Sequence, residues 1–201
     1  MIIGSVCENK NTERRISITP ENVKKFISNG FKVYLEKNYG EHLDIDDEIF
    51  ANHGAELYTD KENILSKADI LLQLNLPNEN DLKHLSPNKN LIGVFDPIKN
   101  KNLISKLSAN NINVFSLELL PRITRAQSMD ILSSQANLAG YKAVVDAFSF
   151  FNKAVPMMMT AAGTIPAAKV LVVGAGVAGL QAIAPAKRMG AVVFATDVRM
   201  A

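Results

Sequence analysis

The sequence predicts an α/β fold, in which an N-terminal α/β domain with a parallel sheet is joined by a long helix to a truncated Rossmann domain. Two observations predict it. Short apolar runs alternate with helical patterns over roughly the first 120 positions, which is typical of parallel strands covered by helices. Near the end, a glycine-rich turn stands between an apolar run and a helical pattern. The expected divisions are an N-terminal domain at 1–127, a connecting helix and bridge at 128–165, and a partial Rossmann domain at 166–201.

Composition excludes several classes of protein. The 201 residues suit one large or two small domains, and the net charge of +2 comes from mixed charges without a Lys/Arg run, so no nucleic-acid partner is expected. The single cysteine, Cys7, cannot form an internal disulfide and is interpreted as a small buried residue. The longest apolar region, 154–186, is interrupted by prolines and glycines, which argues against a membrane span. A soluble, cytoplasmic segment without a metal site is expected.

The first stretch reads as strands separated by helices. Thr19 is an expected N-cap, since it precedes Pro20 at the first helical position. The expected strands are 2–6, 32–36, 70–74, 90–94 and 113–117, and the expected helices are 20–29, 46–52 and 100–109.

A long helix is expected from about 128 to 151, followed by a short bridging segment to about 167. Small side chains line this helix and allow another backbone to come close: Ser133, Ser134, Ala136, Ala139, Gly140 and Ala143. A strand at 169–173, a helix at 177–189 and a strand at 191–196 form one βαβ unit. Because one such unit leaves apolar faces uncovered, the natural chain is expected to continue beyond residue 201.

The glycine turn carries the most specific chemistry. It reads Gly174, Ala175, Gly176, Val177, Ala178 and Gly179, a G-x-G-x-x-G between a predicted strand and a predicted helix. The first glycine permits the tight turn, the second makes room for a pyrophosphate, and the third lets helix and strand pack closely. The free N–H groups of the helix then face the phosphates. The alternative is a tight turn in an α/β fold that binds nothing.

Asp197 lies 23 positions after Gly174, where dinucleotide-binding folds carry the acidic residue that binds the adenosine ribose. A carboxylate there would also repel a 2′-phosphate, so NAD(H) is favoured over NADP(H). Arg199 is close by and weakens this preference.

A polar loop enters the long helix. Arg122 could donate to a nicotinamide carboxamide, Asp130 could accept from it, and Gln127 could do both. In the alternative interpretation the loop is solvated, Ser128 is the N-cap and Asp130 lies in the first turn of the helix. The chemistry of the residues leaves both open.

Three segments resemble one family. The stretch RITRAQSMDILSSQANLAGY (122–141) is similar to the signature of the NAD(H)-binding component of proton-translocating transhydrogenases. MMMTAAGTIPAAKVLVVGAGVAGLQAIA with ATDVR resembles the same family, and ERRISITPENV is a segment that the family shares with alanine dehydrogenases. One departure is Ala167, where a second proline is expected. The resemblance implies that Arg122, Gln127, Asp130 and Ser133 hold the nicotinamide end, Gly174 to Gly179 the pyrophosphate, and Asp197, with Val198 and Arg199 beside it, the adenosine ribose.

The resemblance also implies an activity. It would be Si–Re (AB)-specific hydride transfer from NADH to NADP⁺, coupled to proton movement. The expected partners are an NADP(H)-binding component, a membrane component on whose cytoplasmic side this segment works, and a second copy in a homodimer. The 201 residues alone are expected to be inactive.

Two alternatives compete. Alanine dehydrogenases look similar, but they use a Lys and a His as acid–base groups, and Asn75 and Asp96 occupy the matching positions here. Arg15, which matches their substrate-binding arginine, is interpreted as structural and paired with an acidic neighbour. The other alternative is a noncatalytic NAD-binding module.

Overall fold

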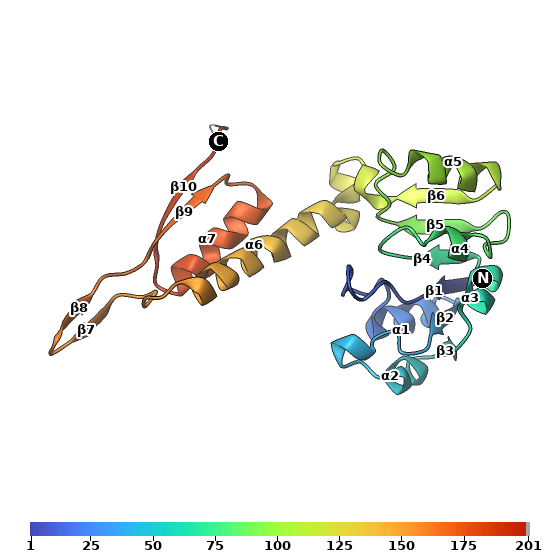
Figure 1. Ribbon diagram of the computed structural model, residues 1–201, viewed down its shortest axis with the longest axis horizontal. Helices are drawn as coiled ribbons and strands as arrows, with labels where there is room; N and C mark the ends of the chain where they lie inside the picture. Colours follow the sequence, from blue (N-terminus) through green and yellow to red (C-terminus); the bar gives the residue numbers. More distant parts are fainter. Residues whose placement is uncertain (200–201) are drawn as a thin grey trace. The chain divides into compact units, whose positions relative to one another are not determined.

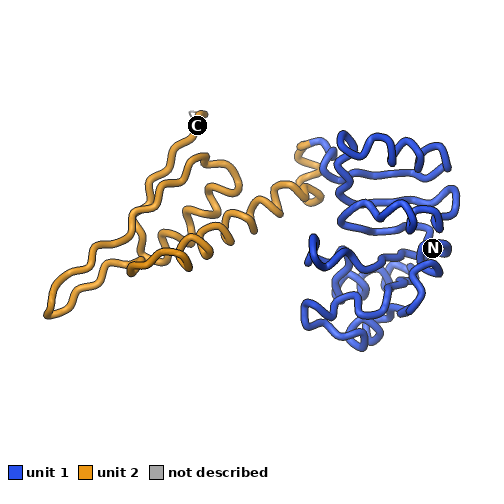
Figure 2. The backbone as a smooth tube through the Cα atoms, viewed as in Figure 1, with its two compact units in different colours: residues 1–121 blue, residues 122–201 orange. Residues whose placement is uncertain are grey.

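The computed structural model describes residues 1–199, and its contacts divide the chain into two compact units, Met1–Pro121 and Arg122–Ala201 (Figure 2). The sequence placed divisions at 127 and 165 instead. The difference arises because α6 (Ile131–Phe150) packs along α7 (Val177–Arg188), so the polar loop and the long helix belong to the second unit.

The first unit is a six-stranded, wholly parallel sheet with the strand order β3-β2-β1-β4-β5-β6. The chain builds one half outward from β1 and then returns to build the other half from β4 (Figure 1). The strands are β1 (Ile2–Ser5), β2 (Lys32–Glu36), β3 (Ala55–Tyr58), β4 (Ile70–Leu72), β5 (Asn90–Gly93) and β6 (Asn113–Ser116). The helices are α1 (Pro20–Ser28), α2 (Asp47–Asn52), α3 (Lys61–Lys67), α4 (Glu79–Leu82) and α5 (Lys101–Ala109).

Both faces of this sheet carry core side chains. On β2, Val33 and Leu35 belong to one buried cluster, whereas Tyr34 between them belongs to the other. This alternation follows from the period of two along a strand. The core of the first unit therefore lies in two layers, one on each side of the sheet.

The predicted strands of the first unit are confirmed, several with shorter bounds. The Thr19 hydroxyl accepts from the Asn22 N–H at 3.4 Å, which confirms it as the N-cap of α1. The strand β3, with the sequence AELY, and the helices α3 and α4 were not predicted. Cys7 is half-buried rather than buried, and burial together with the Glu36 carboxylate raises the pKa of its thiol to about 12.

The second unit contains α6, a two-stranded antiparallel hairpin of β7 (Met158–Thr160) and β8 (Gly163–Ile165), and a parallel βαβ unit. The βαβ unit runs through β9 (Lys169–Val173), α7 and β10 (Val192–Thr196). The expected start of the long helix at 128 is wrong by three residues, and the expected bridging segment is largely the hairpin. Within residues 1–199, no helix has the length and apolarity needed to cross a bilayer.

Candidate functional site

The glycine turn adopts the conformation that its sequence predicts. Gly174 follows β9 with a φ of +96°, a left-handed conformation that favours glycine, and α7 begins at Val177 with Gly176 as its N-cap. A Cβ on Gly179 would lie 1.8 Å from the Gly174 carbonyl oxygen, so only glycine lets the helix lie this close to the turn. The free N–H groups of the first turn of α7 therefore surround a space suited to an anion.

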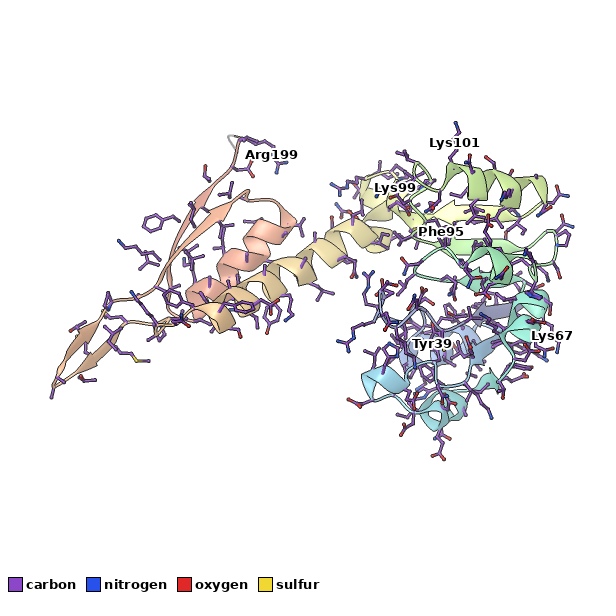
Figure 3. All side chains as sticks on the ribbon, in the orientation of Figure 1. Tyr39, Lys67, Phe95, Lys99, Lys101 and Arg199 are labelled. Atoms are coloured by element: carbon purple, nitrogen blue, oxygen red, sulfur yellow. The ribbon has the colours of Figure 1, made fainter. Side chains whose placement is uncertain are left out.

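Asp197 directly follows β10 and reaches back to this turn. Its carboxylate accepts from the Ala175 N–H at 2.7 Å and from the Arg199 N–H at 2.8 Å. These N–H groups, that of Arg199 first, lower the pKa of Asp197 below its usual range. Asp197 is therefore an ionised acceptor held at the edge of the turn, whereas Val198 and the Arg199 side chain are exposed (Figure 3).

The polar loop ends in a cap on α6. The loop forms a 3-10 helix, Thr124–Met129, and Asp130 is the N-cap of α6 in place of the expected Ser128. The Asp130 carboxylate accepts from the Ser133 N–H at 2.9 Å and from the Ser133 hydroxyl at 2.7 Å. These two donors, the N–H first, and the positive charge of Arg122 lower the pKa of Asp130.

One cavity of about 400 Å³ in the second unit joins the loop to the glycine turn. It brings Arg122 and Ser133 from the predicted nicotinamide group to the same wall as five of the six turn residues. Gln127 is exposed and does not lie on this wall. The lining residues are Arg122, Leu132, Ser133, Ala136, Val173, Gly174, Gly176, Val177, Ala178 and Gly179.

Sequence analysis did not select Leu132 and Val173 as lining residues, and it selected Ala136 only as a small residue of the helix. The signal for the helix was available, because Leu132 and Ala136 are four residues apart and lie with Ser133 along one side of α6. Val173 is the last residue of β9, the position from which a strand delivers its turn to a ligand.

The positions that match the acid–base pair of alanine dehydrogenases lie in the first unit. The Asn75 side chain donates to the Glu8 carboxylate at 3.2 Å, and Asp96 forms an ion pair with Lys99 at 2.7 Å. The Lys99 ammonium lowers the pKa of Asp96, so this carboxyl does not exchange a proton near neutral pH. Neither position carries a group suited to proton transfer at neutral pH.

Arg15 is paired with Glu13, as expected from the sequence. The guanidinium donates to the two carboxylate oxygens at 2.8 and 2.6 Å. This contact lowers the pKa of Glu13 and raises that of Arg15. A residue that sequence analysis missed is Glu118, which accepts from the N–H groups of Phe95 and Asp96 and so fixes the loop after β5.

The fold and the turn define an α/β protein with a Rossmann-type βαβ unit. Residues 4–139 match the family described as alanine dehydrogenase/PNT, N-terminal domain, and residues 143–201 match its C-terminal domain. The chain belongs to the alanine dehydrogenase/PNT family.

Relatives within the family are more similar on the transhydrogenase side. The chain is 45% identical over 199 residues to the first portion of the NAD(P) transhydrogenase alpha subunit of Rhodospirillum rubrum, covering 96% of this chain and 52% of that protein. It is 42% identical to the protein of the same name from Rickettsia prowazekii, covering 100% and 54%. An alanine dehydrogenase of Methanococcus maripaludis is 27% identical, covering 98% and 53%. The chain thus spans about half the length of these curated relatives.

Solved structures agree with this order. A transhydrogenase from Sinorhizobium meliloti superposes with a TM-score of 0.94 at 47% identity, covering 99% of this chain and 59% of that one. An L-alanine dehydrogenase gives a TM-score of 0.84 at 20% identity, covering 99% and 55%, and shows the shared fold alone.

Proposed function

We propose that this chain binds NAD(H) and serves as the NAD(H)-binding component of a proton-translocating transhydrogenase. The observation that carries the proposal is the cavity in which Arg122 and Ser133 share a wall with the glycine turn. A dinucleotide with its pyrophosphate at the turn would reach the polar loop with its nicotinamide end. The similarity to the transhydrogenase subunits supports the same assignment.

The pyrophosphate end is assigned to Gly174 through Gly179. The close approach between Gly179 and Gly174 leaves the amides of α7 uncovered by side chains, which fits a bound pyrophosphate. Asp197 accepts hydrogen bonds from the adenosine ribose, with Val198 and Arg199 beside it. Because Asp197 is ionised, it also disfavours a 2′-phosphate, and the site prefers NAD(H) to NADP(H).

The nicotinamide end is assigned to Arg122, Gln127, Asp130 and Ser133. When bound, NADH supplies a hydride that passes to NADP⁺ on another component, and this transfer needs no proton at the reacting carbon. The chain's own residues orient the carboxamide, keep one face of the ring open and limit access of water. A positioning loop without an acid–base pair fits that work, and Asn75 and Asp96 fit it equally.

The partners follow from the same assignment. An NADP(H)-binding component docks over the polar loop, and a membrane component on whose cytoplasmic side the complex works couples Si–Re (AB)-specific transfer to proton movement. A homodimer is part of the proposal. Exposed apolar side chains on the β7–β8 hairpin and before it, Met157, Met158, Met159 and Ile165, support a protein contact there.

The test uses the natural full-length protein mixed with an NADP(H)-binding transhydrogenase component. Hydride transfer from NADH to an NADP⁺ analogue is measured, with alanine plus NAD⁺ as a parallel assay. Transfer between nucleotides without alanine oxidation is expected. Arg122→Ala and Gln127→Ala should each slow transfer about tenfold or more, because a misplaced ring leaves the reactive geometry.

A matched control is Arg125→Ala, which removes an exposed guanidinium from the same loop but not from the cavity wall. It should leave transfer nearly unchanged. Alanine oxidation without transfer would overturn the proposal in favour of a dehydrogenase. NAD(H) binding without either activity would favour a noncatalytic module.

A further inference from the structure

Helices α6 and α7 approach each other most closely at Gly140. Gly140 is buried, and a Cβ built on it would lie 2.1 Å from the carbonyl oxygen of Ala178 and 2.8 Å from its carbonyl carbon. These are backbone atoms of a helix, so they cannot move aside as the end of a flexible side chain would. Any side chain at position 140 therefore has to push the two helices apart (Figure 1 shows them side by side).

The contact lies close to the candidate site. Ala178 belongs to the first turn of α7, within the glycine-rich segment, and it lines the cavity. On the other helix, Ser133 and Ala136 line the same cavity, and Ala136 is one turn before Gly140. The spacing of α6 and α7 at Gly140 therefore determines how far Ser133 lies from the glycine turn.

We infer that Gly140 is a positioning residue, whose missing side chain sets the distance between the groups that bind the two ends of the dinucleotide. The inference rests on the proposed NAD(H) site. The nucleotide is a single molecule of fixed covalent length, with its pyrophosphate held by α7 and its nicotinamide held at the start of α6. A change in helix spacing cannot be absorbed at both ends, so one end loses its contacts.

The direction of the effect follows from which end is more firmly held. The pyrophosphate is bound by N–H groups of one continuous turn, whose geometry is independent of α6. The nicotinamide end depends on residues that move with α6. An ordinary contact between a Cβ and a neighbouring atom is 3.4–4 Å, so the Gly140 contact must widen by about 1 Å or more when a methyl group is added. A misplacement of about 1 Å can slow a reaction by about 100-fold.

The experiment compares two ligands on the natural full-length protein. NADH contacts both ends of the site, whereas ADP-ribose has the adenosine and pyrophosphate but lacks the nicotinamide. For Gly140→Ala, the affinity for ADP-ribose should stay within about twofold of the unmodified protein. The affinity for NADH should fall, and hydride transfer at saturating NADH should slow about 10- to 100-fold.

Two control variants separate spacing from general weakening. Ala139→Ser adds one atom at the neighbouring exposed position of α6 and should change neither affinity nor rate. Val144→Ala removes packing at the other buried position of α6 without adding an atom to the contact. It should lower the melting temperature but leave the ratio of the NADH and ADP-ribose affinities as it was.

Three results would overturn the inference. Equal losses of both affinities in Gly140→Ala, including loss of folding, would assign Gly140 to stability alone. A variant indistinguishable from the unmodified protein would show that the spacing does not matter. The same change of affinity ratio in Val144→Ala would remove spacing as the cause. Absence of transfer in the unmodified protein would instead count against the proposed function, and the comparison of the two ligands would still decide the role of Gly140.

Discussion

Asp197 has two roles in the geometry of a few atoms. One carboxylate oxygen accepts from the Ala175 N–H of the glycine turn, and the other accepts from the Arg199 N–H. Both oxygens keep a free lone pair, because a carboxylate can accept about four hydrogen bonds. The carboxylate therefore orders the turn and still has capacity for ribose hydroxyl groups.

Replacing Asp197 with Asn separates charge from shape. The amide retains one accepting oxygen for the turn but loses the second acceptor and the negative charge. We expect NADH affinity to fall about tenfold, in line with loss of a hydrogen bond to a charged group, and NADPH affinity to rise because the 2′-phosphate is no longer repelled. Fluorescence titration with both nucleotides measures this. Unchanged preference between them would count against Asp197 as the ribose-binding residue.

The pH dependence of binding follows from the same carboxylate and from Asp130. Backbone N–H groups hold the pKa of each below the usual aspartate range, so both stay ionised as the pH falls through that range. Their contribution to stability is present above the ordinary aspartate pKa and is lost only as the pH falls through the lowered folded-state pKa. NADH affinity should therefore be flat between about pH 5 and pH 8. A titration with a midpoint inside that interval would contradict this.

The sequence predicted the site residues with regular spacing better than those fixed by local competition. Asp197 could be found because a βαβ unit brings the end of its second strand beside the turn of the first. Glu118 could not, since its role depends on two N–H groups of the loop after β5, far from it in the sequence. Asp130 was recognised as polar and functional, but its competition with Ser128 for the cap could not be decided from residue type alone.

At the scale of elements, the start of α6 couples helix capping to the candidate site. Asp130 caps the helix through Ser133, and the charge of Arg122 lies near enough to lower its pKa. Asn is as good an N-cap as Asp but carries no charge. The cap and the charge can therefore be tested separately at one position.

We expect Asp130→Asn to keep the melting temperature of the full-length protein nearly unchanged while slowing hydride transfer about tenfold, because the electrostatic partner of Arg122 is lost. Asp130→Ala should lower both, since the N-cap is lost as well. Thermal unfolding and steady-state rates measure the two effects. If the Asn variant transfers hydride at the rate of the unmodified protein, Asp130 acts as a cap only.

Elements with a clear period were predictable, and elements formed by tertiary contacts were not. The strand β9 and the helix α7 follow from an apolar run, a glycine turn and a helical pattern. The β7–β8 hairpin has only three residues in each strand, and its sequence of methionines, threonine and alanine has no clear alternation. The bounds of α6 shifted because the polar loop formed a separate 3-10 helix before it.

At the scale of the whole chain, the two units have separate cores and separate polar networks. In the first unit, the buried Tyr39 hydroxyl contacts the Ser5 and Ser17 hydroxyls at 2.8 and 2.9 Å and accepts from the N–H groups of Ser17 and Ile18 (Figure 3). The Gln73 side chain extends this network by accepting from the Ser5 hydroxyl at 2.9 Å. The network joins the carboxyl ends of β1 and β4 to the segment before α1.

Replacing Tyr39 with Phe leaves the N–H groups of Ser17 and Ile18 without their acceptor. Leaving buried donors unpaired costs about 1–3 kcal/mol each, so the free energy of unfolding of the first unit should fall by about 2 kcal/mol or more. Since the candidate site lies in the second unit, NADH affinity should stay unchanged. Tyr58→Phe is the matched control, because its hydroxyl donates to the exposed Glu56 carboxylate, and it should have little effect on either quantity. A fall in NADH affinity in Tyr39→Phe alone, measured well below its melting temperature, would show that the polar network of the first unit acts on the dinucleotide site.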